Sequence, residues 1–360
     1  MSTVNKKEVT GTPVTSITWK RLWAFLKTEQ GRTVFALAFV SGLFAAVYKA
    51  ADNAMMNRYI TRTDDLTAAS TYLIIGGWVG VLTRILYSFL FGRRYIDGDY
   101  HGLSRGSRRM HQYALLAGAL AALGTLATLK GNQGADPGVL IALSSFQIVF
   151  MGRWDRQKGQ HLQGTVTPYI LVVLFGCIMA SFEGSWNFPW WTLLLVLLVS
   201  SPINAYSSHF GQEGARAGDS ISYSFWRFFW LAAVGTVGVT LVALVRGKGD
   251  LLWASVNEAL ASPAVWVVVV VTMFFVFFND TLETRAKKEA GASLAYVFLI
   301  ALAAQIALGN PVTIIGEWMS PGIFGGRPDG AVVWIVRSIG LLLVGVGIFH
   351  LRGKNSATAK

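Results

Sequence analysis

The chain has little cysteine and little charge for its length. Cys177 is the single cysteine among 360 residues, so neither an internal disulfide nor a cysteine-based metal site can form within one chain. Only 14% of the residues are charged, whereas 53% are hydrophobic, and the mean hydropathy is +0.48. This composition excludes a disordered chain, a secreted disulfide scaffold and an ordinary cytosolic enzyme. Cys177 lies inside an apolar run and is expected to be a small packing residue.

Two motifs of well-known enzyme classes are also missing. No G-x-x-x-x-G-K-[ST] loop is present to hold the phosphates of ATP, so the chain is not expected to drive primary transport by itself. No H-E-x-x-H motif occurs and the histidines are scattered, which argues against a metal enzyme. No cluster of acid, base and nucleophile stands out either, so we expect no enzymatic activity and no cofactor.

Long apolar runs are abundant. A helix needs about 17 to 25 mainly apolar residues to cross the hydrocarbon core of a bilayer, because its backbone polar groups must be paired within the segment. Ten runs meet this requirement and predict an all-α integral membrane protein with ten transmembrane helices, at about 33–52, 71–92, 112–130, 137–153, 167–182, 190–209, 223–245, 263–279, 292–309 and 330–350. The glycine- and proline-containing connections between them are too short to form a separate domain.

The basic residues follow the predicted connections. The chain has 31 Lys and Arg against 19 Asp and Glu, a net charge of +12. When connections are assigned alternately to two sides, one side receives most of this positive charge, as the positive-inside rule requires of the cytoplasm. The alternation supports ten spans with both termini cytoplasmic, in a plasma or inner membrane. The basic residues are expected to mark topology and to contact anionic lipids, and no nucleic acid partner is expected.

The chain is predicted to consist of two tails and two halves. Residues 1–32 form a polar, basic N-terminal tail without the apolar core of a signal peptide. Within it, residues 17–29 could form an amphipathic helix on the membrane surface or a short extension of the first span. Residues 33–182 and 183–350 each hold five predicted spans, and residues 351–360 form a C-terminal tail.

Short matches relate the two halves. The segment 52–59 resembles 203–210, and the segment 148–154 resembles 312–318. Five helices per half is an odd number, so the second half must enter the membrane from the opposite side. This predicts an inverted repeat, an arrangement found in many secondary transporters with a binding site between the two halves.

The second half also carries the pattern of a known family. The relevant segments are 285–288 (RAKK), 295–296 (AY), 302–304 (LAA), 310–320 (NPVTIIGEWMS) and the glycine-rich 339–347. They resemble the EamA-like branch of the drug/metabolite transporter superfamily, and the resemblance in architecture covers residues 33–350. It implies a ten-helix carrier whose ninth helix continues past Pro311 with a kink, and it implies no particular substrate. In the first half, Arg153 stands where the family has a glutamate.

Four basic residues lie inside the predicted spans or at their margins, namely Lys49, Arg84, Arg227 and Arg337. Each would cost about 2.5 to 3.5 kcal/mol at the centre of a lipid-exposed helix, so they are expected to face a cavity, a partner or an interface. Their positive charge predicts an anionic or zwitterionic substrate.

Lys49 belongs to a polar stripe on the first span, formed at helical spacing by Lys49, Asp52, Asn53 and Met56 and repeated on the sixth span as Ser200, Asn204, Ser207 and Ser208. Two such stripes suit helices that line a central cavity. Lys49 could attract a carboxylate or phosphate of the substrate. Alternatively, it could pair with Asp52 or extend to the membrane surface.

The remaining basic residues allow two interpretations each. Arg84 and Arg227 lie among aromatic residues, in patches that resemble the family's second and seventh helices, and a stacked arginine can hold an anion. Arg227 could instead belong to an interfacial aromatic belt. Arg337 could bind substrate or pair with Glu317.

Glu317 is the predicted coupling carboxylate, because burial would raise its pKa, and its alternative role is to brace a loop. The sequence Asn279-Asp280-Thr281 matches the glycosylation pattern but falls on the cytoplasmic side of the predicted topology, so we interpret it as a chance match. Asn310 is a further hydrogen-bonding candidate on the ninth span. The predicted substrate-binding set is Lys49, Asn53, Met56, Arg84, Asn204, Ser208, Arg227, Tyr296, Gln305 and Arg337.

These features predict a secondary-active transporter that moves a small polar metabolite by alternating access through a central cavity between two repeats. Its expected partners are the small-molecule substrate, membrane lipids and, if it is not a monomer, a second copy in a homodimer. The alternative is a membrane-embedded accessory subunit or lipid-handling protein that uses the same fold.

Overall fold

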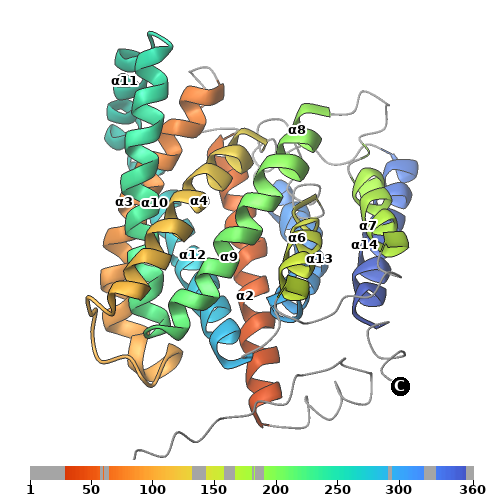
Figure 1. The fold of residues 1–360 in the computed structure, drawn as a ribbon. Helices are drawn as coiled ribbons and strands as arrows, with labels where there is room; N and C mark the ends of the chain where they lie inside the picture. The colour runs from red at the N-terminus through yellow and green to blue at the C-terminus, as the bar shows by residue number, and fades with distance from the viewer. Residues whose placement is uncertain are drawn as a thin grey trace, which may run out of the picture.

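A computed structural model of the chain describes residues 29–56, 60, 65–131, 143–157, 167–180, 182, 190–290, 294–319 and 330–353. In these ranges every regular element is a helix (Figure 1). The amphipathic helix predicted within residues 17–29 and the side chain of Cys177 lie outside the described residues.

The helices in chain order are α2 (Glu29–Ala54), α3 (Asp65–Phe91), α4 (Arg108–Gly131), α6 (Gln147–Gln157), α7 (Thr167–Ala180), α8 (Trp190–Leu194), α9 (Ser201–Arg216), α10 (Ser220–Val245), α11 (Gly249–Ala261), α12 (Pro263–Ala290), α13 (Leu294–Met319) and α14 (Ala331–Gly353). Two π-helical segments continue neighbouring helices: η2 (Gly92–Ile96) follows α3, and η4 (Leu195–Ser200) joins α8 to α9.

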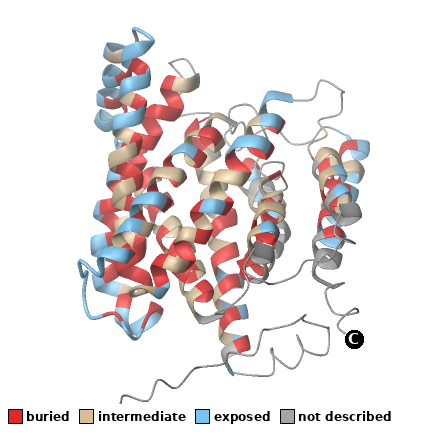
Figure 2. Ribbon diagram, in the orientation of Figure 1, coloured by how far each residue is buried: buried red, intermediate tan, exposed pale blue. Residues whose placement is uncertain are grey.

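Five helices of the described residues are long and apolar enough to cross a membrane: Gly31–Asp52, Leu66–Ile96, Arg108–Lys130, Ser220–Val245 and Pro263–Lys288. Their outward faces carry large apolar side chains, such as Phe89 on α3 and Val245 at the end of α10, which are 87% and 90% exposed (Figure 2). Such faces suit contact with lipid. The predicted helical membrane protein is confirmed at this level.

Several helices differ from their predicted ranges: α6 begins only at Gln147, α9 runs to Arg216, and α11 and α12 differ as follows. Helix α11 occupies a connection that was expected to be irregular. Its buried face, which includes Leu252 and Val256, packs on α3. The helix has only 13 residues, so a search for long apolar runs does not detect it. Helix α12 runs to Ala290 rather than to 279, because the protein interior accommodates charged side chains of its last turns, such as Asp280. Helix α13 continues through Pro311, as the resemblance implied.

Small residues allow several helices to approach closely. Gly42 on α2 faces the backbone of Ala301 on α13, and a Cβ at Gly42 would lie 2.1 Å from the Ala301 carbonyl oxygen. Gly176 on α7 and Gly340 on α14 meet in the same way, at the edge of the molecule (Figure 1). Helix packing in membranes relies on such contacts between small residues, because the surrounding lipid is as apolar as the helices.

The helix pairs surround an interior that is partly polar. Helix α2 packs on α12 and α13, α9 packs on α4 and α6, α3 packs on α10, and α7 packs on α14. The largest apolar cluster joins α3, α4, α10, α11 and α12 through side chains such as Leu73, Leu231 and Val269. Beside this cluster, polar side chains of α2, α9, α10 and α12 face the interior.

Candidate functional site

A cavity of about 250 Å³ lies in the interior of the helix bundle. Side chains from α2, α3, α4, α6, α9, α10, α12 and α13 form its walls, together with Ser144 and Val196. Among the lining residues that the structure describes, the basic ones outnumber the acidic ones by one: they are Lys49, Arg84, Arg227 and Lys287 against Asp52, Asp280 and Glu283. The cavity is therefore close to charge balance.

The first group of charges lies on α2, where Lys49 and Asp52 are separated by one helical turn. The Lys49 ammonium donates hydrogen bonds to Gln305 Oε1 at 2.9 Å and to Ser144 Oγ at 3.3 Å. The Tyr72 hydroxyl donates to Asp52 Oδ1 at 2.5 Å. These contacts do not include the Lys49–Asp52 ion pair that the sequence left open. The hydrogen-bond partners of this α2 group are neutral, although Lys49 and Asp52 attract each other and Glu283 also attracts Lys49.

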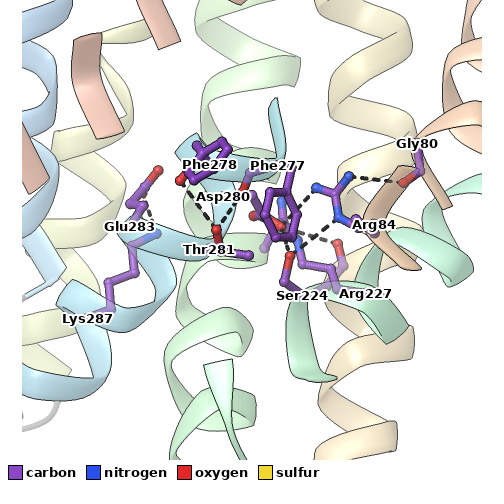
Figure 3. Close-up of polar contacts among 12 residues, drawn as sticks. Gly80, Arg84, Ser224, Arg227, Phe277, Phe278, Asp280, Thr281, Glu283 and Lys287 are labelled. Carbon is purple, nitrogen blue, oxygen red and sulfur yellow. Dashed lines mark hydrogen bonds and ion pairs between the residues drawn. The ribbon is translucent and has the colours of Figure 1, made fainter. Parts of the chain in front are cut away.

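The second group of charges centres on Asp280 of α12 (Figure 3). Arg84 Nη2 from α3 lies 3.2 Å from Asp280 Oδ2, and Arg227 Nη1 from α10 binds the other carboxylate oxygen. The Ser224 hydroxyl donates to Asp280 Oδ2 at 2.5 Å. The Arg84 side chain is completely buried, and its guanidinium carbon lies 3.5 Å from the centre of the Phe228 ring. One carboxylate thus joins three helices.

A third ion pair continues this α12 group by one helical turn. Lys287 Nζ lies 2.5 Å from Glu283 Oε1, and both side chains line the cavity. Gln212 of α9 donates to the Lys287 carbonyl oxygen at 3.4 Å, which ties α9 to the same turn of α12. Figure 3 shows Glu283 and Lys287 beside the turn that bears Asp280. In contrast to the α2 group, each charge of the α12 group has an ionic partner.

The structure brings together six of the residues predicted from the sequence. Lys49, Arg84, Asn204, Ser208, Arg227 and Gln305 all line the cavity. Lys49 and Gln305 bond to each other although 256 positions separate them. Asn204 donates to Ser200 Oγ at 3.0 Å, so two of the four predicted members of the polar stripe on the sixth span are in contact.

Three other predicted residues lie elsewhere. Met56 and Glu317 are buried outside the cavity lining. Arg337 Nε donates to the Phe182 carbonyl oxygen at 2.8 Å, away from the cavity. The side chains of Asn53, Tyr296 and Asn310 lie outside the described residues.

Sequence reasoning missed the acidic partners of the site. Asp280 was assigned to a chance glycosylation pattern, Glu283 was not singled out, and Lys287 was considered only as part of the basic segment 285–288. A usable signal was present, because Asp280, Glu283 and Lys287 recur at spacings of three and four residues. That spacing places charged side chains on one helix face directly after an apolar run.

Comparisons with known proteins identify no family. No protein-family model and no curated protein matches the chain. A solved structure described only as "Crystal structure of protein" is similar at a TM-score of 0.49 and 13% identity, over 89% of this chain and 99% of that chain.

Proposed function

We propose that the protein is a secondary-active transporter that carries a small polar solute through the central cavity by alternating access. The α2 group supports this most directly. A charge in a low-dielectric interior is costly unless it is closely paired. Lys49 and Asp52 attract each other, and Glu283 also attracts Lys49, but the hydrogen bonds described for Lys49 and Asp52 go to neutral groups. A solute with groups of opposite charge would add direct ionic contacts to both residues when it enters.

The helix pairing supports an inverted repeat of two five-helix halves, residues 33–182 and 183–350. If α2 corresponds to α9, α4 to α12 and α6 to α13, the packing of α2 on α12 and α13 is repeated by α9 on α4 and α6. The pairs α3–α10 and α7–α14 would then join corresponding helices across a two-fold axis. Transporters of this type rock one half against the other around a fixed site.

The resemblance to EamA-like drug/metabolite transporters agrees with this arrangement. In the proposed topology ten helices span the membrane and both termini lie in the cytoplasm, as the distribution of basic residues indicates. The absence of a phosphate-binding loop from the sequence favours transport driven by a solute gradient.

The size and charge of the cavity narrow the proposed substrate. A volume of about 250 Å³ lies just below the ~300 to 1,000 Å³ of most small-molecule pockets and favours a solute of roughly amino acid size. Arg84 and Arg227 were expected to attract anions, but Asp280 already binds both. The near balance of charge therefore favours a zwitterion over a multiply charged anion.

Transport in liposomes tests the proposal. Purified protein would be reconstituted and supplied with radiolabelled amino acids, amines, organic acids and phosphorylated sugars. We expect uptake of at least one small zwitterion, and we expect it to be lost in Lys49→Met but retained in Lys248→Met, whose side chain does not line the cavity. A protein that moves no member of the panel and purifies with a constant partner would favour the accessory subunit.

A further inference from the structure

The segment between α3 and α4, residues 92–107, folds across the start of α10 and the end of α12. Trp226 Nε1 on α10 donates to the Ser104 carbonyl oxygen at 2.8 Å, and the Ser104 N–H donates to Ser222 Oγ at 3.2 Å. The ring of Tyr100 lies against Gly92, where a Cβ would come within 2.6 Å of it. This segment therefore covers one end of the helix bundle in a defined conformation.

Asp97 is the central contact of this segment, and its residue is only 3% exposed. The carboxylate accepts hydrogen bonds from the backbone N–H of Ser220, at 3.2 Å, and of Asp99, at 3.1 Å. Lys288 Nζ and Arg285 Nη1 from the end of α12 approach it at 3.9 and 4.0 Å. A carboxylate at a helix start is favoured by the free N–H groups and by the helix dipole.

The ionisation of Asp97 agrees with these contacts. Burial by itself would raise the pKa of the carboxyl group. The hydrogen bonds from Asp99 and Ser220, together with the charge of Lys288, outweigh burial and hold the pKa below its usual range. Asp97 is thus charged at neutral pH and binds two helices in that form.

The same two helices hold the ionic group of the cavity. On α10, Ser220 is the first residue, and Ser224 and Arg227 follow one and two turns later, where they bind Asp280. On α12, Arg285 and Lys288 lie in the same turns as Glu283 and Lys287, which line the cavity. The start of α10 and the end of α12 cannot separate without breaking the contacts of Asp97.

We infer that Asp97 is the latch of a gate that closes the cavity at the end formed by the start of α10 and the end of α12. The inference rests on the proposed transport function, since alternating access requires one state in which this end is closed and another in which it is open. In the open state Asp97 releases Ser220, Arg285 and Lys288, and the cavity becomes accessible beside Glu283 and Thr284.

Cysteine labelling tests the latch without any substrate. The reporter is Thr284→Cys, at a position that lines the cavity and is 5% exposed, in a Cys177→Ser background. Reconstituted protein would react with a membrane-impermeant maleimide. Asp97→Asn should raise the labelling rate about tenfold, within the ~5- to 150-fold range of typical conformational couplings, because the amide carries no charge to hold Arg285 and Lys288.

A matched control lies two residues away in the same segment. Asp99 is also an acid close to Lys288, at 3.5 Å, but its side chain is 82% exposed. Exposed ion pairs contribute little, so Asp99→Asn should change the labelling rate less than about twofold. Equal rates in Asp97→Asn and Asp99→Asn would overturn the latch.

A second variant covers the case in which Asp97→Asn does not fold. Ser220→Pro removes the N–H that Asp97 accepts, at a first helical position where proline is tolerated. Asp219 before it has φ −87° and ψ 154°, which suits the residue that precedes a proline. This variant should also raise the labelling rate about tenfold. A folded Ser220→Pro protein that labels at the parent rate would contradict the inference.

The two proposals fail in different experiments. If solute uptake is present but labelling is unchanged in Asp97→Asn and Ser220→Pro, the transport function stands and the latch is wrong. If labelling rises as expected while the whole solute panel stays outside the liposomes, the gate is supported and the proposed transport of these solutes is wrong.

Discussion

The α2 group and the α12 group of the cavity differ in what compensates their charges. In the α12 group, Asp280 binds Arg84 and Arg227, so desolvation of these charges is offset within the protein. In the α2 group, Lys49 and Asp52 attract each other, but their hydrogen bonds go to an amide and to hydroxyl groups and not to an opposite charge. Charge inside the membrane is therefore a poor guide to substrate binding unless its partners are known. We propose that the α12 group braces the helices and that the α2 group recognises the substrate.

The largest expected effect comes from removing the centre of the α12 group. Asp280→Asn leaves the fully buried Arg84 without its carboxylate, which should lower the free energy of unfolding by about 3 to 5 kcal/mol. Thermal unfolding in detergent, followed by tryptophan fluorescence, would measure the loss. Glu283→Gln is the control on the same helix face, and it should destabilise the protein less because Glu283 pairs with one lysine, whereas Asp280 pairs with two arginines. A fully stable Asp280→Asn protein would remove the bracing role.

The second effect concerns recognition by the α2 group. Lys49→Met keeps an unbranched apolar side chain but removes the charge. Uptake of the zwitterion should therefore fall about 100-fold, which corresponds to the loss of one strong charge-assisted hydrogen bond of ~2 to 3 kcal/mol. Unfolding should be nearly unchanged. Lys287→Met removes a lysine whose charge Glu283 already compensates, and uptake should fall less. If the two variants lose uptake equally, the division between the two groups is wrong.

Much of the fold could be predicted from the sequence, because a membrane requires long apolar segments. Helices α2, α3, α4, α10 and α12 each contain such a segment. Helix α11 could not be found in this way, since it is amphipathic and short. The last turns of α12 were missed because their charges resemble a connection, although Asp280 and Glu283 face the interior of the protein.

The site could be predicted only in part, because the sequence shows which residues are polar but not which distant residues they contact. Lys49, Arg84 and Gln305 stood out as polar residues in apolar runs, and all three line the cavity. Their partners depend on tertiary structure: 196 positions separate Arg84 from Asp280. Helical spacing can place residues on one face, but it cannot say which distant helix packs against that face. The role of each charge therefore became visible only from its contacts.

A third, smaller effect separates the two charges of the α2 group. Asp52→Asn should weaken transport of a zwitterion about tenfold, because a single charged contact of roughly 1.4 kcal/mol is lost. A carboxylate of the same size that has no ammonium group does not use this contact. In the variant it should therefore be transported better relative to the zwitterion. Tyr72→Phe removes only the hydrogen bond to Asp52 and should change uptake by a few fold. Competition assays with the two solutes would measure the preference. If Asp52→Asn leaves this preference unchanged, the ammonium group of the solute must contact a residue other than Asp52.

The smallest effect concerns Asp97, which resembles the α12 group in having charged partners although it lies outside the cavity. Its pKa is lowered in the folded protein, so its stabilising contribution is fully present above the unfolded pKa of about 4 and is lost only as the pH falls through the lower, folded value. The charged groups around it are Asp99, Arg285 and Lys288. Labelling of Thr284→Cys, corrected for the intrinsic reactivity of the thiol, should therefore change less than about twofold over this range. A steep rise of the labelling rate toward pH 5 would mean that burial, and not the surrounding hydrogen bonds and charges, dominates the pKa of Asp97. Asp97 would then resemble a carboxylate without charged partners.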